Sequence, residues 1–380
     1  MRITFVGFGL LASSVAAAIK QAKLPTVVRA VSSPATLARA KELGLADECF
    51  GYDELKDWVP GSDMILLCAP ILHILHTIEN LAQMDLSVLS SQPKILVSDI
   101  GSTKVEICKA GAKLPKPFVF VGSHPMAGSE KRTLEYNDPS IFENAYWFVC
   151  PPEGVEETDY KSLLDLISFV GANAVVFPPE HHDRTMAWVS HMPQMLSSTL
   201  AASMPERLVK PSYQHYAGRA FRDMTRIAAS GWNMWHDIAV TNRDQTVLAL
   251  REVREGLDKT IEAMDHLQVV SDGKPAADDH AGELESVFKA GNEGRASLFE
   301  KGRNAAAAFS EITVPLKDVP GALLQVLSPL AQNNLNIRDI ELMKVRENIA
   351  GTLLLAFKTP EEARRAVQIL KLLGYDVKER

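Results

Sequence analysis

Cysteine is scarce in this 380-residue chain, and its four cysteines lie far apart: Cys49, Cys68, Cys108 and Cys150. None of them forms a Cys-x-x-Cys pair, and none has histidines nearby at the spacing of a zinc site. We therefore expect no bound metal. Unpaired, reduced thiols are typical of proteins of the cytoplasm, so the cysteines also favour a cytoplasmic protein.

Long hydrophobic runs and an excess of positive charge are lacking as well. No apolar run approaches the length that spans a membrane. The apolar N-terminal stretch is interrupted by Gly7 and Gly9 and lacks a small-residue cleavage site, so it indicates a first strand and not a signal peptide. The formal net charge of -7 argues against a nucleic-acid binder. We expect neither a membrane nor a nucleic acid as a partner.

A glycine-rich turn near the N-terminus predicts a dinucleotide site. A short β run at residues 3–6 leads into GFGLLA at residues 7–12 and then into an alanine-rich helical stretch. This is a GxGxxA pattern between a strand and a helix, in which Gly7 permits the tight turn and Gly9 lets the backbone approach a pyrophosphate. The helix N-terminus then faces the phosphates. The candidate cofactor contacts at this turn are Gly7, Phe8, Gly9, Leu10 and Leu11.

The second predicted strand, residues 26–31, lacks the acidic residue at its end that binds the ribose hydroxyls of NAD. Arg29 lies within this strand, and Ser32 and Ser33 follow it. Without a carboxylate, a 2′-phosphate is not repelled, and the two serines with Arg29 or Arg39 can contact it. This pattern favours NADP as the cofactor. The alternative is that Arg29 points to solvent and NAD binds without the acid.

Two further predicted strands end at residues that should share the crevice of the glycine turn. Residues 64–68 lead to Ala69 and Pro70, which are candidate cofactor contacts, and residues 95–97 lead to a segment that contains Ser102 and Lys104. In an open α/β sheet, ligands bind beyond the carboxyl ends of the strands. Ser102 can donate to a substrate, cap the following helix, or do both. Lys104 can offer a charge.

A lone histidine stands at the end of the next predicted strand, residues 118–121. The segment that follows reads GSHPMAGSE, so small residues and a proline hold His124 there. An imidazole at this place can take or give a proton near neutral pH. The alternative is a turn with an exposed histidine. Strands at residues 147–149 and 174–177 would complete the sheet.

From about residue 178 to 300, strand-like runs give way to helical periodicity. An arginine among the apolar residues and tryptophans of residues 220–237 is costly unless it meets a carboxylate. That carboxylate can belong to Asp223, to Asp237 or to a substrate. Large apolar helices commonly become buried in a dimer, so we expect a homodimer. Residues 272–281 indicate a loop, and residues 302–308 a linker.

The last 70 or so residues follow a βαββαβ order, which is that of a ferredoxin-like fold. We expect strands at 309–314, 337–345, 351–357 and 375–378 and helices at 321–332 and 360–373. The turn Asp318-Val319-Pro320-Gly321 and Asn336-Ile337 resemble the amino-acid-sensing ACT domain. The resemblance implies an effector site for an amino acid, and the alternative is a module that only dimerises.

The predicted fold class is therefore α/β with three domains. Residues 1–177 form a Rossmann-type doubly wound sheet that binds the dinucleotide. Residues 178–301 form an all-helical domain for substrate binding and dimerisation. Residues 309–380 form a ferredoxin-like, ACT-like regulatory domain. The length of the chain allows two or three domains of ordinary size.

In this order the motifs make the chain resemble the prephenate/arogenate dehydrogenase family of tyrosine biosynthesis. The matching stretches are residues 7–12, 99–104, 123–130, 182–183 with 190–193, and 221–226 with 234–237. The resemblance implies an oxidative decarboxylation of prephenate to 4-hydroxyphenylpyruvate. A hydride leaves the C4 carbon of a cyclohexadienol for nicotinamide, the ring carboxylate leaves as carbon dioxide, and the ring becomes aromatic.

The resemblance also implies roles for single residues. His124 would accept a hydrogen bond or a proton from the 4-hydroxyl, and Ser102 would share that contact. Arg226 would bind the ring carboxylate, and His191 and Trp235 would lie in the same pocket. No metal is needed, because aromatisation supplies the driving force and nicotinamide accepts the hydride.

Gln194 departs from the family pattern. Many members that prefer prephenate have a second histidine in Ser-His-x-Pro-His, at the position of Gln194. The resemblance implies that this position faces the substrate side chain, which is a keto acid in prephenate and an amino acid in arogenate. A neutral amide relaxes the preference for prephenate, so arogenate, converted to tyrosine, is the alternative substrate. Tyrosine is also the candidate effector of the ACT-like domain.

Two other classes of protein stay open. A β-hydroxyacid or 6-phosphogluconate-type dehydrogenase also combines a sheet with helices, but it needs a catalytic lysine, and Lys210 and Lys259 stand in no clear motif. A sensor without catalysis could retain the nucleotide fold and the ACT-like module. The joint presence of His124, Ser102 and Arg226 argues against a sensor.

Overall fold

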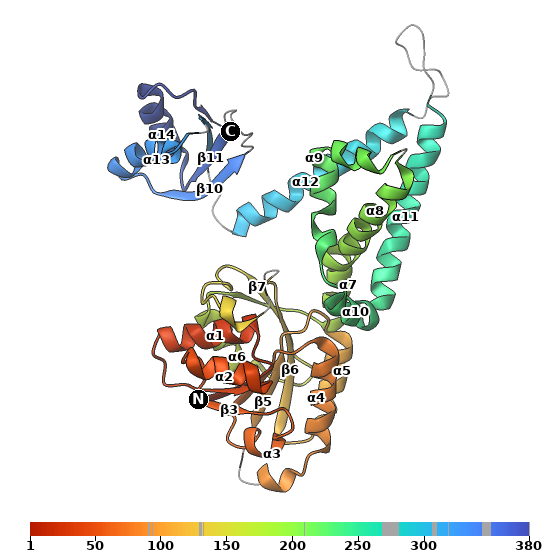
Figure 1. Ribbon diagram of the computed structural model, residues 1–380, viewed down its shortest axis with the longest axis vertical. Coiled ribbons are helices and arrows are strands. Elements are labelled where there is room, and N and C mark those ends of the chain that lie inside the picture. The colour runs from red at the N-terminus through yellow and green to blue at the C-terminus, as the bar shows by residue number, and fades with distance from the viewer. Residues whose placement is uncertain are drawn as a thin grey trace. The chain divides into compact units, whose positions relative to one another are not determined.

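The computed structural model describes residues 1–89, 92, 94–128, 131, 133–208, 210–267, 281–305, 310–317, 319–343 and 351–379. The chain forms two compact units, Met1–Gly256 and Leu257–Arg380. Figure 1 labels helices and strands along the chain. Within the described ranges, none of the helices combines the length and the apolar character that crossing a membrane requires.

An eight-stranded sheet is the centre of the first unit. Its spatial order is β3-β2-β1-β4-β5-β6-β7-β8. The order runs in opposite directions on the two sides of β1, as in dinucleotide-binding sheets. The predicted Rossmann-type sheet is thereby confirmed. The strands are β1 (Arg2–Val6), β2 (Val27–Val31), β3 (Glu48–Phe50), β4 (Met64–Leu67), β5 (Ile95–Asp99), β6 (Phe118–Pro125), β7 (Tyr146–Cys150) and β8 (Asn173–Val176).

Strand β7 is the exception to the parallel pairing of the sheet. Strands β1 to β6 pair in parallel, whereas β7 runs antiparallel to β6 and places Phe148 opposite His124. The described residues between these strands contain only the short helix η2 (Leu134–Tyr136). A parallel neighbour needs a long crossover, usually a helix, so the chain turns back instead. Strand β6 also continues past the predicted end at residue 121, so His124 lies within the strand.

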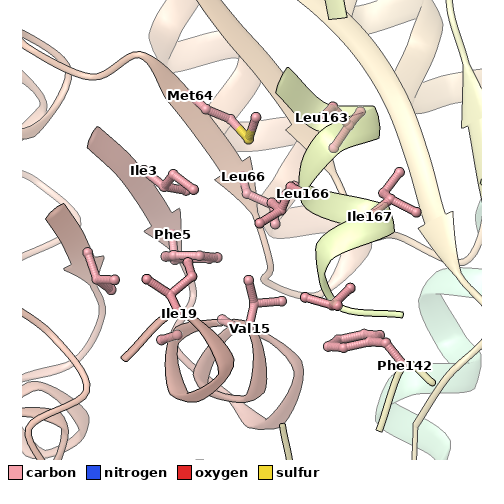
Figure 2. Packing of buried hydrophobic residues seen from close by; sticks show 14 of the residues in the cluster. Ile3, Phe5, Val15, Ile19, Met64, Leu66, Phe142, Leu163, Leu166 and Ile167 are labelled. Carbon is pink, nitrogen blue, oxygen red and sulfur yellow. The ribbon is translucent and has the colours of Figure 1, made fainter. Parts of the chain in front are cut away.

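Helices cover the sheet on both faces, as alternating apolar residues of its buried strands require. One hydrophobic cluster joins Phe5 of β1 and Leu66 of β4 to helices α1 and α6, as Figure 2 shows. The other joins Ile65 of β4 to Ile74 of α4. The helices are α1 (Leu10–Gln21), α2 (Pro34–Glu42), α3 (Leu55–Trp58), α4 (Ile71–Gln83), α5 (Val105–Gly111) and α6 (Glu157–Phe169).

The chain is helical after β8, as predicted. The π-helical turn η3 (Ala187–His191) separates the first two helices, and such turns are frequent at functional sites. The other elements are α7 (Pro179–Met186), α8 (Met192–Arg207), η4 (Pro211–Tyr216), α9 (Arg219–Thr225), η5 (Arg226–Ala229), α10 (Trp232–Thr241), α11 (Arg243–Asp265) and α12 (Ala281–Ala305). Helix α12 includes residue 281 of the predicted loop and residues 302–305 of the predicted linker, so both predictions were wrong there. The remainder of that loop and linker lies outside the described residues.

The C-terminal part of the second unit holds a four-stranded antiparallel sheet in the order β10-β11-β9-β12. Ile312 and Val314 of the sheet pack against Val326 and Leu370 of two helices. The last strand starts later than predicted, because the N–H of Tyr375 closes the end of the preceding helix on the carbonyl of Leu370. In chain order the elements are β9 (Ser310–Leu316), α13 (Ala322–Gln332), β10 (Ile337–Met343), β11 (Gly351–Phe357), α14 (Pro360–Leu372) and β12 (Lys378–Glu379).

Candidate active site

A cavity of about 450 Å³ lies near the carboxyl ends of β5 and β6 in the first unit. Four predicted site residues line it: Ser102 after β5, His124 on β6, His191 at the end of η3 and Trp235 on α10. A few convergent polar groups among apolar side chains are typical of a small-molecule site. The remaining lining residues are Pro125, Met126, Ala127, Gly128, Ile141, Ser190, Met234 and Ile238.

His124 is the first member of a buried hydrogen-bonded chain. Its Nδ1 lies 2.9 Å from Nε2 of His182, and Nδ1 of His182 lies 2.8 Å from Oδ1 of Asp183. The Asp183 carboxylate also accepts the backbone N–H groups of Lys104 at 2.7 Å and Val105 at 2.9 Å. Although the motif comparison included His182 and Asp183, sequence reasoning gave them no role. The only signal was an adjacent His-Asp pair at the start of a helix.

The hydrogen-bonded chain from His124 to Asp183 determines which nitrogen of His124 carries the proton. A carboxylate only accepts hydrogen bonds, so Nδ1 of His182 carries its proton and Nε2 of a neutral His182 accepts. Nδ1 of His124 must then donate, which leaves Nε2 of His124 with a free lone pair. Burial lowers the pKa of His124 well below 6.5, and the charges of His182, Lys104 and His191 act in the same direction. His124 is therefore a neutral base near pH 7.

Asp99, at the end of β5, holds the loop of Ser102 and the strand of His124 together. Its Oδ2 accepts the N–H of Gly101 at 2.7 Å, and its Oδ1 accepts the N–H of Ser123 at 3.1 Å. The Lys104 ammonium forms an ion pair with Asp99, and both side chains are fully buried. The prediction that Lys104 offers a charge to a ligand is wrong, because Asp99 occupies it.

The hydroxyl of Ser102 is not used as a helix cap. Helix α5 starts at Val105, and the Asp183 carboxylate accepts the N–H groups at its start. Ser102 and His124 both line the cavity. Two roles were considered for Ser102, donation to a substrate and capping of the following helix, and this geometry excludes the second.

The two other predicted substrate residues, Arg226 and Gln194, are not among the residues that line the cavity. Gln194 is buried, and its amide nitrogen Nε2 donates to the carbonyl of Ile227 at 2.9 Å and to the hydroxyl of Ser198 at 3.2 Å. Gln194 therefore ties η5 to α8. In this structure it holds the segment that begins at Arg226, instead of facing the cavity itself.

Arg226 is exposed, contrary to the expectation of an arginine packed among apolar residues. Neither Asp223 nor Asp237, the two carboxylates considered as its partners, pairs with Arg226. Asp223 pairs with Arg219 at 3.4 Å, and Asp237 accepts the N–H of Leu72 at 3.2 Å. Within the part of the chain that the structure describes, Arg226 has no ion-pair partner, so its charge is available to a ligand.

The glycine turn has the shape that a dinucleotide requires. Gly7 has a φ of 91°, and a Cβ there would lie 2.8 Å from the backbone nitrogen of Ala69. Only glycine fits where the ends of β1 and β4 meet. Helix α1 starts at Leu10 with Gly9 as its N-cap, and Pro70 is the N-cap of α4. Neither cap makes a side-chain hydrogen bond. In the first turn of α4 the N–H of Leu72 donates to Asp237, so the N–H groups at the start of α1 are the better placed for an anion.

The side chain of Phe8 is buried and meets Phe5 edge-to-face at 6.1 Å between ring centroids. Only its backbone can therefore serve a cofactor, and the same holds for the buried Leu10. Leu11 is partly buried and packs against the core cluster on its face of the sheet.

The prediction for Arg29 is wrong in both of its forms. The side chain is 3% exposed, and its Nε donates to Glu48 at 2.8 Å. Its Nη1 donates to the carbonyl of Trp58 at 2.7 Å and to Ser62 at 2.9 Å, and its Nη2 donates to the carbonyl of Asp57 at 3.0 Å. The guanidinium neither points to solvent nor reaches a 2′-phosphate, because the connection after β3 binds it.

Ser32 and Ser33 do follow β2, as predicted. Ser33 is the N-cap of α2, where its hydroxyl accepts the N–H of Thr36 at 3.4 Å. The second cation considered for this place, Arg39, pairs with Glu42 at 2.6 Å. The end of β2 therefore offers hydroxyl groups, and its two candidate cations are engaged elsewhere.

All four cysteines are free thiols. Burial raises the pKa of Cys150 to about 12 and raises that of Cys108 further, so these thiols stay protonated and unreactive. Among the residues that the structure describes, no group of three or more His, Cys, Asp and Glu side chains is arranged to hold a metal ion.

Comparison with known proteins gives a consistent result. The family description "Prephenate dehydrogenase, nucleotide-binding domain" matches residues 15–176, and "Prephenate dehydrogenase, dimerization domain" matches residues 178–272. Together these matches cover more than half of the chain. The first match starts after the glycine turn, so the turn is independent support.

Individual proteins agree with these matches. The prephenate dehydrogenase of Bacillus subtilis is 27% identical over 372 residues, which are 97% of this chain and 95% of that protein. The prephenate dehydrogenase of Lactococcus lactis is 28% identical over 374 residues, 97% of each chain. The crystal structure of Synechocystis arogenate dehydrogenase is 25% identical, with a TM-score of 0.64, and the similarity covers 78% of this chain and 100% of that one.

Proposed function

Because this chain belongs to the prephenate dehydrogenase family, we propose that it oxidatively decarboxylates prephenate to 4-hydroxyphenylpyruvate with NAD(P). The observation that carries the proposal is the neutral His124, held by His182 and Asp183 in a cavity that Ser102 also lines. This cavity lies near the carboxyl ends of β5 and β6, at the same edge of the parallel sheet as the glycine turn after β1. The backbone of Gly7, Gly9 and Leu10 would hold the pyrophosphate. When bound, NAD(P) supplies the acceptor for the hydride that leaves C4.

His124 acts as the base for the substrate's 4-hydroxyl. Its Nε2 lone pair accepts the hydroxyl hydrogen and takes the proton as loss of hydride builds positive charge at C4. The proton returns to the oxygen when carbon dioxide leaves and the ring becomes aromatic. Nδ1 of His124 keeps its proton and its bond to His182, so the ring cannot turn away. The Asp183 carboxylate then stabilises the positive charge that the two imidazoles share. Ser102 orients the same hydroxyl.

Arg226 binds the ring carboxylate until it leaves as carbon dioxide. We expect Arg226→Ala to raise the KM for prephenate by roughly 10- to 100-fold with a smaller change in kcat, because a charge-assisted contact is worth about 1.5–3 kcal/mol. Steady-state kinetics with Arg219→Ala as the control test this, since Arg219 is an exposed arginine paired with Asp223. If the KM of Arg226→Ala stays level, the carboxylate is bound elsewhere.

The function is tested by a two-by-two assay of prephenate or arogenate with NAD or NADP, followed by the absorbance of the reduced cofactor. We expect turnover mainly with prephenate. Turnover mainly with arogenate would favour the alternative, to which the similarity to an arogenate dehydrogenase points. Absence of turnover with both substrates would reject the proposed function, and the sensor class would then gain support.

The same assay measures the choice of cofactor. The end of β2 has neither an acidic residue to repel a 2′-phosphate nor Arg29 to attract it. The predicted preference for NADP therefore keeps only Ser32 and Ser33 as its support. We expect kcat/KM for NAD and NADP to differ by less than about tenfold, which corresponds to about 1.4 kcal/mol. A hundredfold preference for either cofactor would contradict this expectation.

We propose that the predicted division into residues 1–177, 178–301 and 309–380 is functional. The order of elements after residue 309, and the turn at Val319 to Gly321, support an ACT-like domain that binds an amino acid such as tyrosine; Asp318 of that turn lies outside the described residues.

A homodimer is supported by exposed apolar side chains along α11, namely Val247, Leu248, Leu257, Ile261 and Met264. The free thiols favour the cytoplasm.

A further inference from the structure

The second histidine of the cavity, His191, is held by a residue that no sequence motif singled out. Its Nδ1 lies 3.0 Å from the side-chain nitrogen of Asn242, which follows α10. The same Asn242 nitrogen lies 2.7 Å from the backbone carbonyl oxygen of Asp183. All three residues are buried, and Asn242 is 4% exposed.

These two contacts determine the hydrogen positions. A backbone carbonyl oxygen only accepts, so the Asn242 atom that faces it must be the NH₂ group and not the amide oxygen. That NH₂ group then donates its second hydrogen to Nδ1 of His191, which must be unprotonated. In a neutral imidazole the proton therefore resides on Nε2. His191 becomes a hydrogen-bond donor, whereas His124 is an acceptor.

We propose that Asn242 is a positioning residue that holds His191 as a neutral Nε2–H donor, and that this donor selects an acceptor oxygen of the substrate. The inference rests on the proposed function and deepens it. The substrate has one hydroxyl that donates, at C4, and its other oxygens belong to carboxylate and keto groups that accept. A cavity with an acceptor at His124 and a donor at His191 therefore binds the substrate in one orientation and disfavours the reversed one.

The groups around His191 keep it neutral. Burial lowers the pKa of His191 to about 4, with His182 acting in the same direction and Asp183 opposing it. Both of these residues belong to α7. From β6, His124 lines the same cavity and is itself neutral. From α10, Trp235 meets the His191 ring edge-to-face at 6.0 Å between centroids and carries no charge. Recognition by His191 should therefore not change between about pH 6 and pH 8.

The first test needs no variant of Asn242 and no turnover. The ¹⁵N chemical shifts of the two ring nitrogens of His191 report which one is protonated, and the signals are assigned by their loss in His191→Gln. We expect a protonated Nε2 and an unprotonated Nδ1. Protonation at Nδ1 would overturn the inference even if the protein turns over prephenate. Failure of the proposed function would leave this spectrum unchanged, so the two failures are distinguishable.

The second test moves the His191 proton from Nε2 to Nδ1, so that Nε2 can no longer donate. In Asn242→Asp the new carboxylate only accepts, so Nδ1 of His191 must carry the proton and Nε2 loses it. We expect the KM for prephenate at about pH 8 to rise roughly tenfold, with a smaller change in kcat, and to recover toward about pH 6 as the ring gains a second proton. The wild-type KM should stay level over this range. A KM for Asn242→Asp that equals the wild-type value at both pH values would refute the proposed role.

Thr246→Val is the matched control. Thr246 is buried one turn after Asn242, and its hydroxyl donates to the Asn242 carbonyl at 2.7 Å. The Thr246→Val substitution perturbs the same helix start and should leave the pH dependence of KM as in the wild type. If Thr246→Val reproduces the recovery of KM at low pH, the effect of Asn242→Asp is structural and the inference fails.

Discussion

His124→Asn is expected to lower kcat by roughly 10²- to 10⁴-fold, the range for loss of a general base. Asparagine is the informative replacement because its NH₂ group can still donate to Nε2 of His182, as Nδ1 of His124 does at 2.9 Å. What the variant lacks is the Nε2 lone pair. Steady-state kinetics with prephenate measure the loss, and cofactor affinity, measured by fluorescence titration, should hardly change.

His181→Asn is the control, because His181 is an exposed histidine adjacent to His182 and outside the hydrogen-bonded chain. Its kcat should equal that of the wild type. An unchanged rate in His124→Asn would remove His124 from the mechanism.

The pH profile of the wild type gives a second readout on His124. Burial lowers its pKa well below 6.5, and an imidazole with a lowered pKa remains a base at pH values where an exposed histidine is already protonated. The acidic limb of kcat/KM should therefore lie clearly below pH 6.5. A limb at or above that value would show that another group, or a different environment of His124, controls the rate.

Lys104→Met is expected to lower the free energy of unfolding by about 3–5 kcal/mol, because it leaves the Asp99 charge buried without its partner. Both side chains are fully buried. The substitution should also disturb the cavity. Asp99 accepts the N–H groups of Gly101 and Ser123, which directly precede Ser102 and His124. Urea denaturation followed by circular dichroism measures the change.

Two comparison variants test this interpretation of Lys104. Lys109→Met removes an exposed lysine whose ion-pair distance to Glu106 is 3.9 Å, so we expect less than about 1 kcal/mol. The double variant Lys104→Met with Asp99→Asn replaces the buried charge by a neutral amide and should be more stable than Lys104→Met alone. If Lys104→Met unfolds at the same urea concentration as Lys109→Met, the buried pair contributes little to stability.

The sequence by itself was sufficient for the local features. The glycine turn at Gly7, the buried strands and the change to helices near residue 178 are each written in adjacent residues, as apolar runs, helical periodicity and a need for positive φ. The order of the motifs indicated the family for the same reason. Such patterns depend on neighbours in the chain, and tertiary contacts do not have to be known to read them.

Partners that are distant in the chain were decided only by the tertiary structure. His124 and His182 are 58 residues apart, and Asn242 and His191 are 51 apart. The predictions for Arg29 and Gln194 were wrong for the same reason, because their partners are distant in the chain. Arg29 is held by carbonyl groups of residues 57–60, and Gln194 is held by the carbonyl of Ile227, which no side-chain pattern reveals.

The sequence thus determined which chemical groups this protein has and on which strands and helices they lie. The folded chain decided which of these groups are occupied by one another and which remain for a ligand. The physical reason is that a buried donor or acceptor must find a partner, and the partner is whatever group packing brings within about 3 Å. Backbone carbonyls and N–H groups, which every residue has, were the deciding partners for Arg29, Gln194, Asp183 and Asn242.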